Sequence, residues 1–489
     1  GTLYMNLAND YLGTTTLNAG KTVLGNATAL GSASAPLIIG SNATLDLNVM
    51  QLYTKPVTVQ GAGADGVSGA IVNNNTTTAP AGTQYDIGNL TLSGNTTIGG
   101  ISTAAPSNSG LPGSQYIGRW ALRAQNGSAY LHTTGAFSLT KTGNNQIMFV
   151  NTIADAALAD INVKEGVLSI EGSTTLGNSA STITVDGTGA SQPAGGSILQ
   201  LRNLSSPLNK QILLKNNGQL YAILNGTDTD NTVSGTVTIS TGGGILNAGG
   251  LRDDYPSNTP NASARLILSG DILGSTPMIK RGPGTVILSS TSSSFNGTTS
   301  VEDGTLIVNG TLHGSVTLHT SPTTGVTTVL AGIGTICGTG VTVTDAPGII
   351  IAPGPSYSST STSVGTLTVA DMTFDNASTL SIELNGTAAG QFDVLNSTGT
   401  LALQGACTLA VTLGYTPANG DSFDIINWGT LAGPGFGTLS LPALPDSLSW
   451  DTSNLYTIGS IAVIPEPAAL LMLIMAAGLG LMLKRFRNR

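Results

Sequence analysis

Short runs in which apolar residues alternate with Thr, Ser or Asn recur along most of the chain. Residues 182–185, for example, read Thr-Ile-Thr-Val, and comparable runs occupy residues 43–47, 90–92, 236–239 and 265–268. An alternation with a period of two residues is the pattern of a strand with one buried face. Gly or Asp-Gly separates many of these runs, and Gly readily adopts the positive φ of a tight turn. The pattern therefore predicts many short strands joined by tight turns.

A longer pattern recurs at several places in the chain. Its fullest copy, residues 278–310, contains Lys-Arg-Gly-Pro-Gly-Thr-Val-Ile-Leu and then Phe-Asn-Gly-Thr-Thr-Ser-Val-Glu-Asp-Gly-Thr-Leu-Ile-Val. Residues 139–170 repeat parts of it, and residues 1–20 follow the part that starts at Gly284 with nearly the same spacing. One strand–turn–strand unit cannot bury its own apolar face, whereas stacked units can. The repeats therefore predict a solenoid.

The core Gly-x-Gly-Thr-x-x-Leu, followed by Gly-Thr-Thr-x-Val-x-x-Gly-Thr-Leu-x-Val, resembles the autotransporter-associated β-strand repeat of long bacterial surface proteins. The resemblance covers residues 282–310 best and extends to residues 1–31 and 139–177. It implies an exported, right-handed parallel β-helix, so we expect an all-β fold with such a solenoid over residues 1–352. Because the sequence starts at Gly1 inside a repeat, we expect the solenoid to be truncated at its N-terminus, with the export signal further upstream.

Downstream of the predicted solenoid the composition changes twice. Residues 353–365 are a low-complexity stretch rich in Pro, Gly, Ser and Thr, which we interpret as a linker. Alternation resumes over residues 366–463, and the segment from Leu380 to Ile426 resembles the region that closes β-helical passengers. We therefore predict a β-rich C-terminal cap, which would cover the exposed end of the solenoid.

The composition fits this architecture and excludes one class of partner. Charged residues make up 9% of the 489 residues, whereas ordinary globular domains carry about 25%. The net charge is −9, which argues against nucleic acid as a partner, because nucleic acid needs clustered Lys and Arg. For the two cysteines, Cys337 and Cys407, a disulfide and a pair of buried free thiols both stay open, since sequence separation does not give the distance between their Cα atoms.

The C-terminal residues have the pattern of a membrane anchor. Residues 468–483 carry no charge, and as a helix they would span about 24 Å at ~1.5 Å per residue. A hydrocarbon core of ~30 Å is slightly thicker. The basic residues that follow are expected to stay cytoplasmic, which leaves the β body outside, so we predict one C-terminal transmembrane helix. Its anchor residues are Ala468, Leu470, Leu471, Leu473, Ile474, Leu479, Leu481 and Leu483, and its basic stop is Lys484, Arg485, Arg487 and Arg489.

Pro465, Glu466 and Pro467 stand directly before this apolar run. Pro-Glu-Pro, a short apolar helix and an Arg-rich terminus, in that order, resemble the PEP-CTERM sorting domain, and we assign residues 464–489 to such a segment. The resemblance implies a Gram-negative bacterium and recognition of the motif by exosortase, a membrane-embedded cysteine transpeptidase that cleaves near it. It also implies an exported, inner-membrane-anchored precursor that then reaches the cell surface or the extracellular space.

Enzymes on β-helix scaffolds act on polysaccharides with carboxylates or bases that cluster on one face. Of the three histidines, His132, His313 and His319, the last two lie in Thr-rich segments with no Ser-His-Asp or metal-like company. We therefore predict no catalytic residue, no cofactor and no enzymatic activity.

Two further stretches have candidate ligand chemistry. Residues 228–231 read Asp-Thr-Asp-Asn, which offers the oxygen ligands that Ca²⁺ prefers but lacks the remaining positions of a calcium-binding loop, so we predict no metal site. Arg119, Trp120 and Arg123 form either a carbohydrate-stacking patch or a partly buried amphipathic anchor.

The leading functional interpretation is an exported structural or adhesive β-helical protein of the cell surface or extracellular matrix. Its expected partners are exosortase, the membrane through the C-terminal helix, and extracellular polysaccharide or matrix proteins. The alternatives are a polysaccharide-active lyase or hydrolase on the same scaffold and a passenger-type adhesin. Carboxylates that converge in a groove would favour the enzyme, and a face lined uniformly by Thr, Ser and Asn would favour the structural protein.

Overall fold

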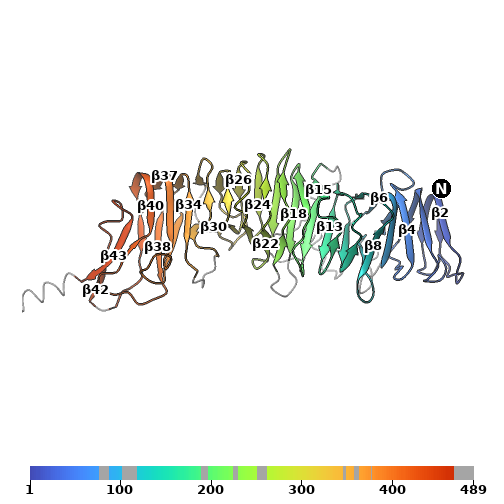
Figure 1. Ribbon diagram of the computed structural model, residues 1–489, viewed down its shortest axis with the longest axis horizontal. Helices are drawn as coiled ribbons and strands as arrows, with labels where there is room; N and C mark the ends of the chain where they lie inside the picture. The colour runs from blue at the N-terminus through green and yellow to red at the C-terminus, as the bar shows by residue number, and fades with distance from the viewer. Residues whose placement is uncertain are drawn as a thin grey trace, which may run out of the picture. The chain divides into compact units, whose positions relative to one another are not determined.

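The structure is a computed structural model, in which every regular element of the described residues is a β-strand (Figure 1). The described residues are 1–75, 87–101, 118–188, 196–223, 230–249, 261–344, 348–356, 363–375, 377–445 and 447–466. None of them belongs to a helix with the length and apolarity needed to cross a membrane. The chain divides into two compact units, Gly1–Gly304 and Thr305–Arg489.

The first unit contains a parallel sheet whose strands lie side by side in nearly the order of the sequence. Its main path is β1 (Thr2–Met5), β2 (Thr15–Leu24), β3 (Leu37–Asp46), β4 (Pro56–Gly61), β6 (Asn89–Gly100), β9 (Leu139–Lys141), β12 (Ile161–Val163), β15 (Thr182–Asp186), β17 (Gln211–Lys215), β20 (Val237–Ile239) and β23 (Ile272–Leu273). Beside this path pair β5 (Ile71–Asn73), β8 (Ala129–Thr133), β11 (Thr152–Ala154) and β14 (Thr175–Leu176).

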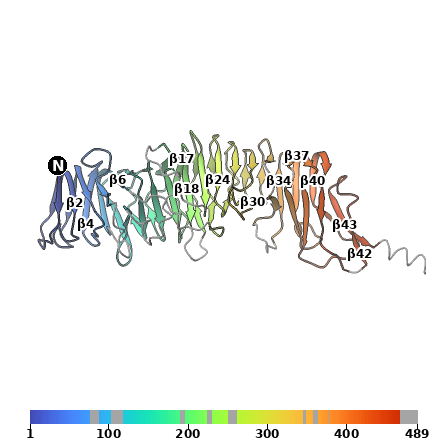
Figure 2. The same ribbon diagram turned by 180° about the vertical axis from the view of Figure 1, so that it is seen from behind.

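Two further parallel sheets complete the first unit, and Figure 2 labels strands of one of them, seen from behind. The second sheet has here β7 (Trp120–Leu122), β10 (Gln146–Val150), β13 (Val167–Glu171), β16 (Ile198–Arg202), β18 (Gly218–Ile223), β21 (Gly244–Ala248), β24 (Met278–Arg281) and β26 (Thr299–Val301). The third sheet has here β19 (Asn231–Val233), β22 (Arg265–Leu268) and β25 (Thr285–Leu288).

From β20 to β25 the chain visits the three sheets in a fixed rotation, first, second, third, and then again. Each strand pairs in parallel with the strand one rotation later, as in β21 with β24 and β22 with β25. Stacked coils of this kind satisfy the backbone N–H and C=O groups of each coil through its neighbours. The arrangement is consistent with a β-helix solenoid and confirms the prediction of a parallel all-β fold.

The core of the first unit is made of ladders of inward-facing side chains. In the second sheet the register aligns Leu168, Leu199, Leu220 and Leu246 on successive strands, and all four are fully buried. Burial of each such side chain contributes about 1.5–3 kcal/mol. One coil contributes only a few of these side chains, so stability depends on stacking.

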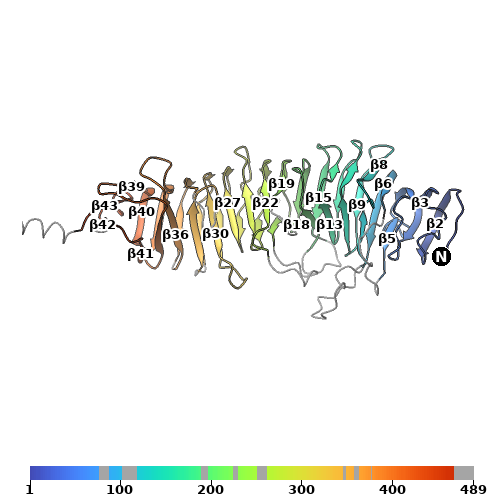
Figure 3. The ribbon, with the colours of Figure 1, turned by 90° about the horizontal axis from the view of Figure 1, so that it is seen from below.

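The second unit repeats the parallel arrangement and ends in an antiparallel sheet (Figure 3). One parallel sheet of this unit has the order β28 (Thr311–Leu312), β31 (Thr335–Ile336), β34 (Thr366–Val369), β37 (Val394–Gln404), β35 (Met372–Phe374), β32 (Val341–Val343) and β29 (Val316–Leu318), with β40 (Ile426–Gly435) on β37. Another has the order β27 (Thr305–Val308), β30 (Thr328–Gly332), β33 (Ile349–Pro353), β36 (Thr379–Leu384), β38 (Thr408–Leu413) and β41 (Thr438–Ser440). The antiparallel sheet has the order β39 (Ser422–Asp424), β43 (Ser460–Pro465) and β42 (Leu448–Asp451).

Several predicted segments fall outside the described residues. Residues 467–489 do so, and they include Pro467, the whole predicted anchor and the basic stop. Residues 357–362 of the predicted linker do so as well, while Pro353 at its start is the last residue of β33. The predicted domain boundaries stay predictions.

Candidate functional site

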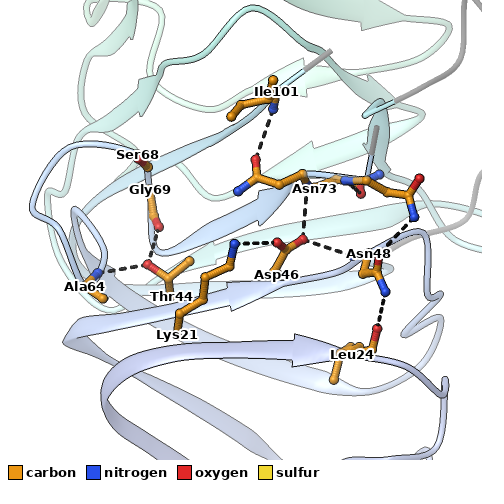
Figure 4. Close-up of polar contacts among 12 residues, drawn as sticks. Lys21, Leu24, Thr44, Asp46, Asn48, Ala64, Ser68, Gly69, Asn73 and Ile101 are labelled. Carbon is orange, nitrogen blue, oxygen red and sulfur yellow. Dashed lines mark hydrogen bonds and ion pairs between the residues drawn. The ribbon is translucent and has the colours of Figure 1, made fainter. Parts of the chain in front are cut away.

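A buried carboxylate joins three coils near the start of the first unit (Figure 4). Asp46, at the end of β3, is only 3% exposed, and its Oδ2 lies 2.8 Å from Nζ of Lys21 on β2. Its Oδ1 accepts the backbone N–H groups of Asn48 and Asn74, each at 3.1 Å. Both oxygens are thus engaged in structural bonds, so this carboxylate serves the corner of the solenoid and not acid–base chemistry.

Asparagine side chains continue the same corner network. Asn48 donates from Nδ2 to the carbonyl of Leu24 at 2.7 Å, and its Oδ1 accepts from Nδ2 of Asn75 at 2.8 Å. Asn48 has a φ of +44°, a region that Asn tolerates better than most residues. Asn73 is buried and donates to the carbonyl of Arg119 at 2.9 Å. The amides therefore tie successive turns to one another.

Two lysines in the repeat pattern lie inside the solenoid. Lys141 occupies an inward position between Ile98 and Val163 on the neighbouring strands, and its side chain is fully buried. Its Nζ donates to the carbonyls of Thr142 at 2.8 Å, Gly143 at 2.6 Å and Glu165 at 3.0 Å. Three carbonyl acceptors match the three N–H donors of an ammonium group.

Lys280 repeats this arrangement in the fullest copy of the pattern. It is fully buried, and its Nζ donates to the carbonyls of Gly282 at 2.5 Å, Gly284 at 2.7 Å and Asp303. Gly304 follows with a φ of +63°, and a Cβ at that position would lie 2.6 Å from Lys280 Nζ. We call these three carbonyls the lysine cradle. The Asp303–Gly304 turn of the repeat covers it and is called its lid.

Burial is the largest influence on both ammonium groups. It lowers the pKa of Lys141 to about 7, against the opposing charge of Glu165. It lowers the pKa of Lys280 to about 7 as well, against the charge of Asp303. Lys55, whose Nζ donates to three carbonyls at 2.6–3.0 Å, also has a pKa lowered by burial. These groups are enclosed and hydrogen-bonded, so they act as internal staples and not as accessible nucleophiles.

The outward faces of the parallel sheets present hydroxyl and amide groups in rows. In the first unit the register aligns Thr97, Thr140, Asn162 and Thr184, all half-buried. In the second unit it aligns Thr317, Thr342 and Thr373. Neighbouring strands lie ~4.8 Å apart, so each row is a regular series of neutral polar groups. This is the kind of face expected for the structural interpretation.

His132 has one carboxylate partner. Its Nδ1 lies 3.1 Å from Asp155 Oδ1, and its ring stacks on that of Tyr130 with centroids 5.4 Å apart. The pKa of Asp155 is lowered, first by the backbone N–H of Thr133 and then by His132. Among the described residues no group of three His, Cys, Asp or Glu is placed to hold a metal ion. The pair is an isolated surface contact.

The remaining candidate ligand residues are used structurally where they are described. Asp230 faces Arg265 at 3.3 Å, and the buried Asn231 donates to the carbonyl of Ile223, while Asp228 lies outside the described residues. Trp120 is fully buried and donates to the carbonyl of Gly99 at 3.0 Å, which rules out stacking of a sugar on its ring.

The two cysteines are both free thiols, so they form no disulfide. Cys407 is buried, as one of the two interpretations expected, but Cys337 is exposed.

Two carboxyl groups approach each other in the second unit. Asp393 is 1% exposed, and it accepts the backbone N–H groups of Gly365 and Glu383, each at 2.9 Å. Burial, together with the charge of Glu383, raises the pKa of Asp393 to about 7, and burial raises that of Glu383. Because Asp393 is enclosed and accepts two backbone N–H groups, it fixes the connection between β36 and β37 to Glu383 and Gly365.

The described part of the predicted sorting motif belongs to the antiparallel sheet. Pro465 is the last residue of β43 and stands opposite Leu448, and the backbone N–H of Glu466 donates to the carbonyl of Ser447 at 2.8 Å. Both side chains are exposed. The motif thus starts on a folded strand, which the tail sequence alone did not reveal.

Two segments of the chain, residues 1–24 and 278–308, match the family model of the passenger-associated-transport-repeat. The second matched segment contains Lys280 and its cradle. These repeats suggest an autotransporter-type passenger, that is, an exported, adhesin-like surface protein of structural type. No curated protein matches the chain significantly.

Proposed function

We propose that this protein is a structural or adhesive component of the cell surface or extracellular matrix and that exosortase processes its C-terminal tail. The observation that carries the surface role is the pair of matched repeats, which contribute strands to parallel sheets and of which the second holds the interior Lys280. The protein displays its outer faces as a scaffold and performs no chemistry with them.

The rows of neutral polar groups support polysaccharide or matrix proteins as partners. Thr140, Asn162 and Thr184 offer donors and acceptors at the spacing of the coils, and a polymer of hydroxyl-bearing sugars can meet several of them at once. Each contact is weak, because water competes for the same groups. Adhesion therefore arises from many contacts along the coils.

The tail supports sorting through its sequence. Pro465, Glu466 and Pro467 precede an uncharged run of sixteen residues and a basic end, residues 484–489. In this proposal the run holds the precursor in the inner membrane while exosortase acts near the motif and releases the body to the cell surface.

The test uses the full chain with an epitope tag after Arg489, in a host that encodes exosortase and in a deletion strain that lacks it. We expect surface-delivered protein to lack the tag in the first strain, and tagged protein to stay with the inner membrane in the second. Tagged protein on the surface of both strains would refute processing, and the deletion strain is the matched control.

A further inference from the structure

We propose that strand β43 sets the inner limit of C-terminal processing: Pro465 and Glu466 can leave the sheet while it stays folded, whereas Val463 and the residues before it cannot. This rests on the proposed processing of the tail and adds a limit that the motif itself does not contain. The limit comes from how the described residues of β43 are bonded and buried.

Val463 is hydrogen-bonded through its backbone and buried through its side chain. β43 is the central strand of its sheet, with β39 on one edge and β42 on the other. The N–H of Val463 donates to the carbonyl of Asp421 at 2.8 Å, and its carbonyl accepts from Gly420 at 2.9 Å. Its side chain is fully buried, and so is that of Phe423 on β39, whose ring lies 6.3 Å from Trp450 of β42. To release Val463 the cap must open its core.

Pro465 and Glu466 are held far more weakly. Pro465 stands opposite Leu448 and has no backbone N–H. It occupies a non-hydrogen-bonded position of the antiparallel ladder, so no N–H donor is needed there. Among the described residues beyond Ile464, the backbone N–H of Glu466 donates to the carbonyl of Ser447 at 2.8 Å. A single exposed bond at the end of a sheet frays readily, so the motif is presented without unfolding.

The processing step breaks one peptide bond. The carbonyl carbon on the body side passes to water or to an amine nucleophile, and the new amino group leaves with the tail. An enzyme must hold the chain on both sides of that bond in an extended form. Among the described residues, only Pro465 and Glu466 can be freed while the rest of β43 stays paired, so the mature body keeps Val463 and Ile464.

The direct test needs no exosortase. The purified full chain in mild detergent is digested with an unspecific protease, and the C-terminus of the resistant body is read by mass spectrometry. We expect trimming to stop at Ile464 or later. A resistant body that ends before Ile464 would overturn the proposal.

A matched pair of variants tests the reason for the limit. Val463→Ala removes buried methyl groups, and Ile464→Ala changes the half-buried neighbour on the opposite face of the strand. We expect Val463→Ala to raise the rate at which the protease removes residues 460–466 by at least roughly tenfold. We expect Ile464→Ala to raise the same rate by less than about twofold. Equal effects of the two variants would overturn the proposal.

The same reading in the exosortase host separates this inference from the proposed function. A mature terminus at Ile464 or later supports both. An unprocessed chain whose protease limit is intact refutes the processing and leaves the limit standing. A processed body that ends before Ile464 refutes the limit and leaves the processing standing.

Discussion

Replacement of Lys280 by methionine tests how the interior of the repeat is held together. The change keeps an unbranched side chain of similar length but removes the ammonium group that binds the carbonyls of Gly282, Gly284 and Asp303. Three buried carbonyls then lose a donor, at a cost of about 1–3 kcal/mol each. The methionine also relieves the desolvation of a buried cation, which offsets several kcal/mol. The difference leaves an expected destabilisation of about 3 kcal/mol.

The assay is hydrogen exchange measured by mass spectrometry on peptides that cover residues 278–304. In a solenoid the loss of stability stays close to the altered coil. A measurement of global unfolding would average this loss over all coils, so a local measurement is needed. A loss of about 3 kcal/mol corresponds to roughly 100-fold faster exchange. The control is Lys164→Met, which changes an exposed lysine and should alter exchange by less than about threefold. Equal exchange rates of residues 278–304 in the two variants would refute the claim that the hydrogen bonds of Lys280 stabilise this coil.

Three other experiments test the buried ionisable groups and the turn glycine of the repeat. Burial lowers the pKa values of Lys141 and Lys280 from 10.5 to about 7, so between these pH values the folded state binds fewer protons than the unfolded state. The first unit should therefore gain stability as the pH rises from about 7 to 10.5. Denaturant titrations of the Lys141→Met/Lys280→Met double variant should show a flatter rise. The pKa of Asp393 is raised from 3.8 to about 7, so the second unit should lose stability as the pH rises through that interval, and unchanged pH dependence in Asp393→Asn would contradict this. Gly304→Ala should cost clearly more stability than Gly66→Ala, since both have positive φ but only the first meets the lysine, and equal melting temperatures would count against the lid.

Much of the fold follows from periodicity alone. The run at residues 265–268 coincides with β22, and the run at residues 182–185 lies within β15. Alternation of apolar and polar residues determines which face of a strand is buried, and this information is local. Stacking into coils followed from the repeats, because isolated units cannot bury their apolar faces.

The interior lysines could not be predicted in the same way. Lysine usually lies on the surface, and nothing local shows that Lys141 and Lys280 face inward. Their burial depends on carbonyls from the next coil, Glu165 and Asp303, which are brought close only by stacking. The one available signal was the recurrence of Lys-x-Gly followed later by an acidic residue and Gly.

The cap shows the same limit of local patterns. Alternation in residues 366–463 predicted β structure, but the antiparallel sheet requires pairing of β42 with β43, which a period of two does not specify. The burial of Val463 next to exposed Pro465 therefore became visible only in the fold.

The central claim is that the β body is exported and displayed. Antibodies raised against the first unit, applied to intact and to permeabilised cells of the source organism, test it most directly. We expect equal labelling of both, with loss of the signal when intact cells are treated with an external protease. Labelling that appears only after permeabilisation would contradict it.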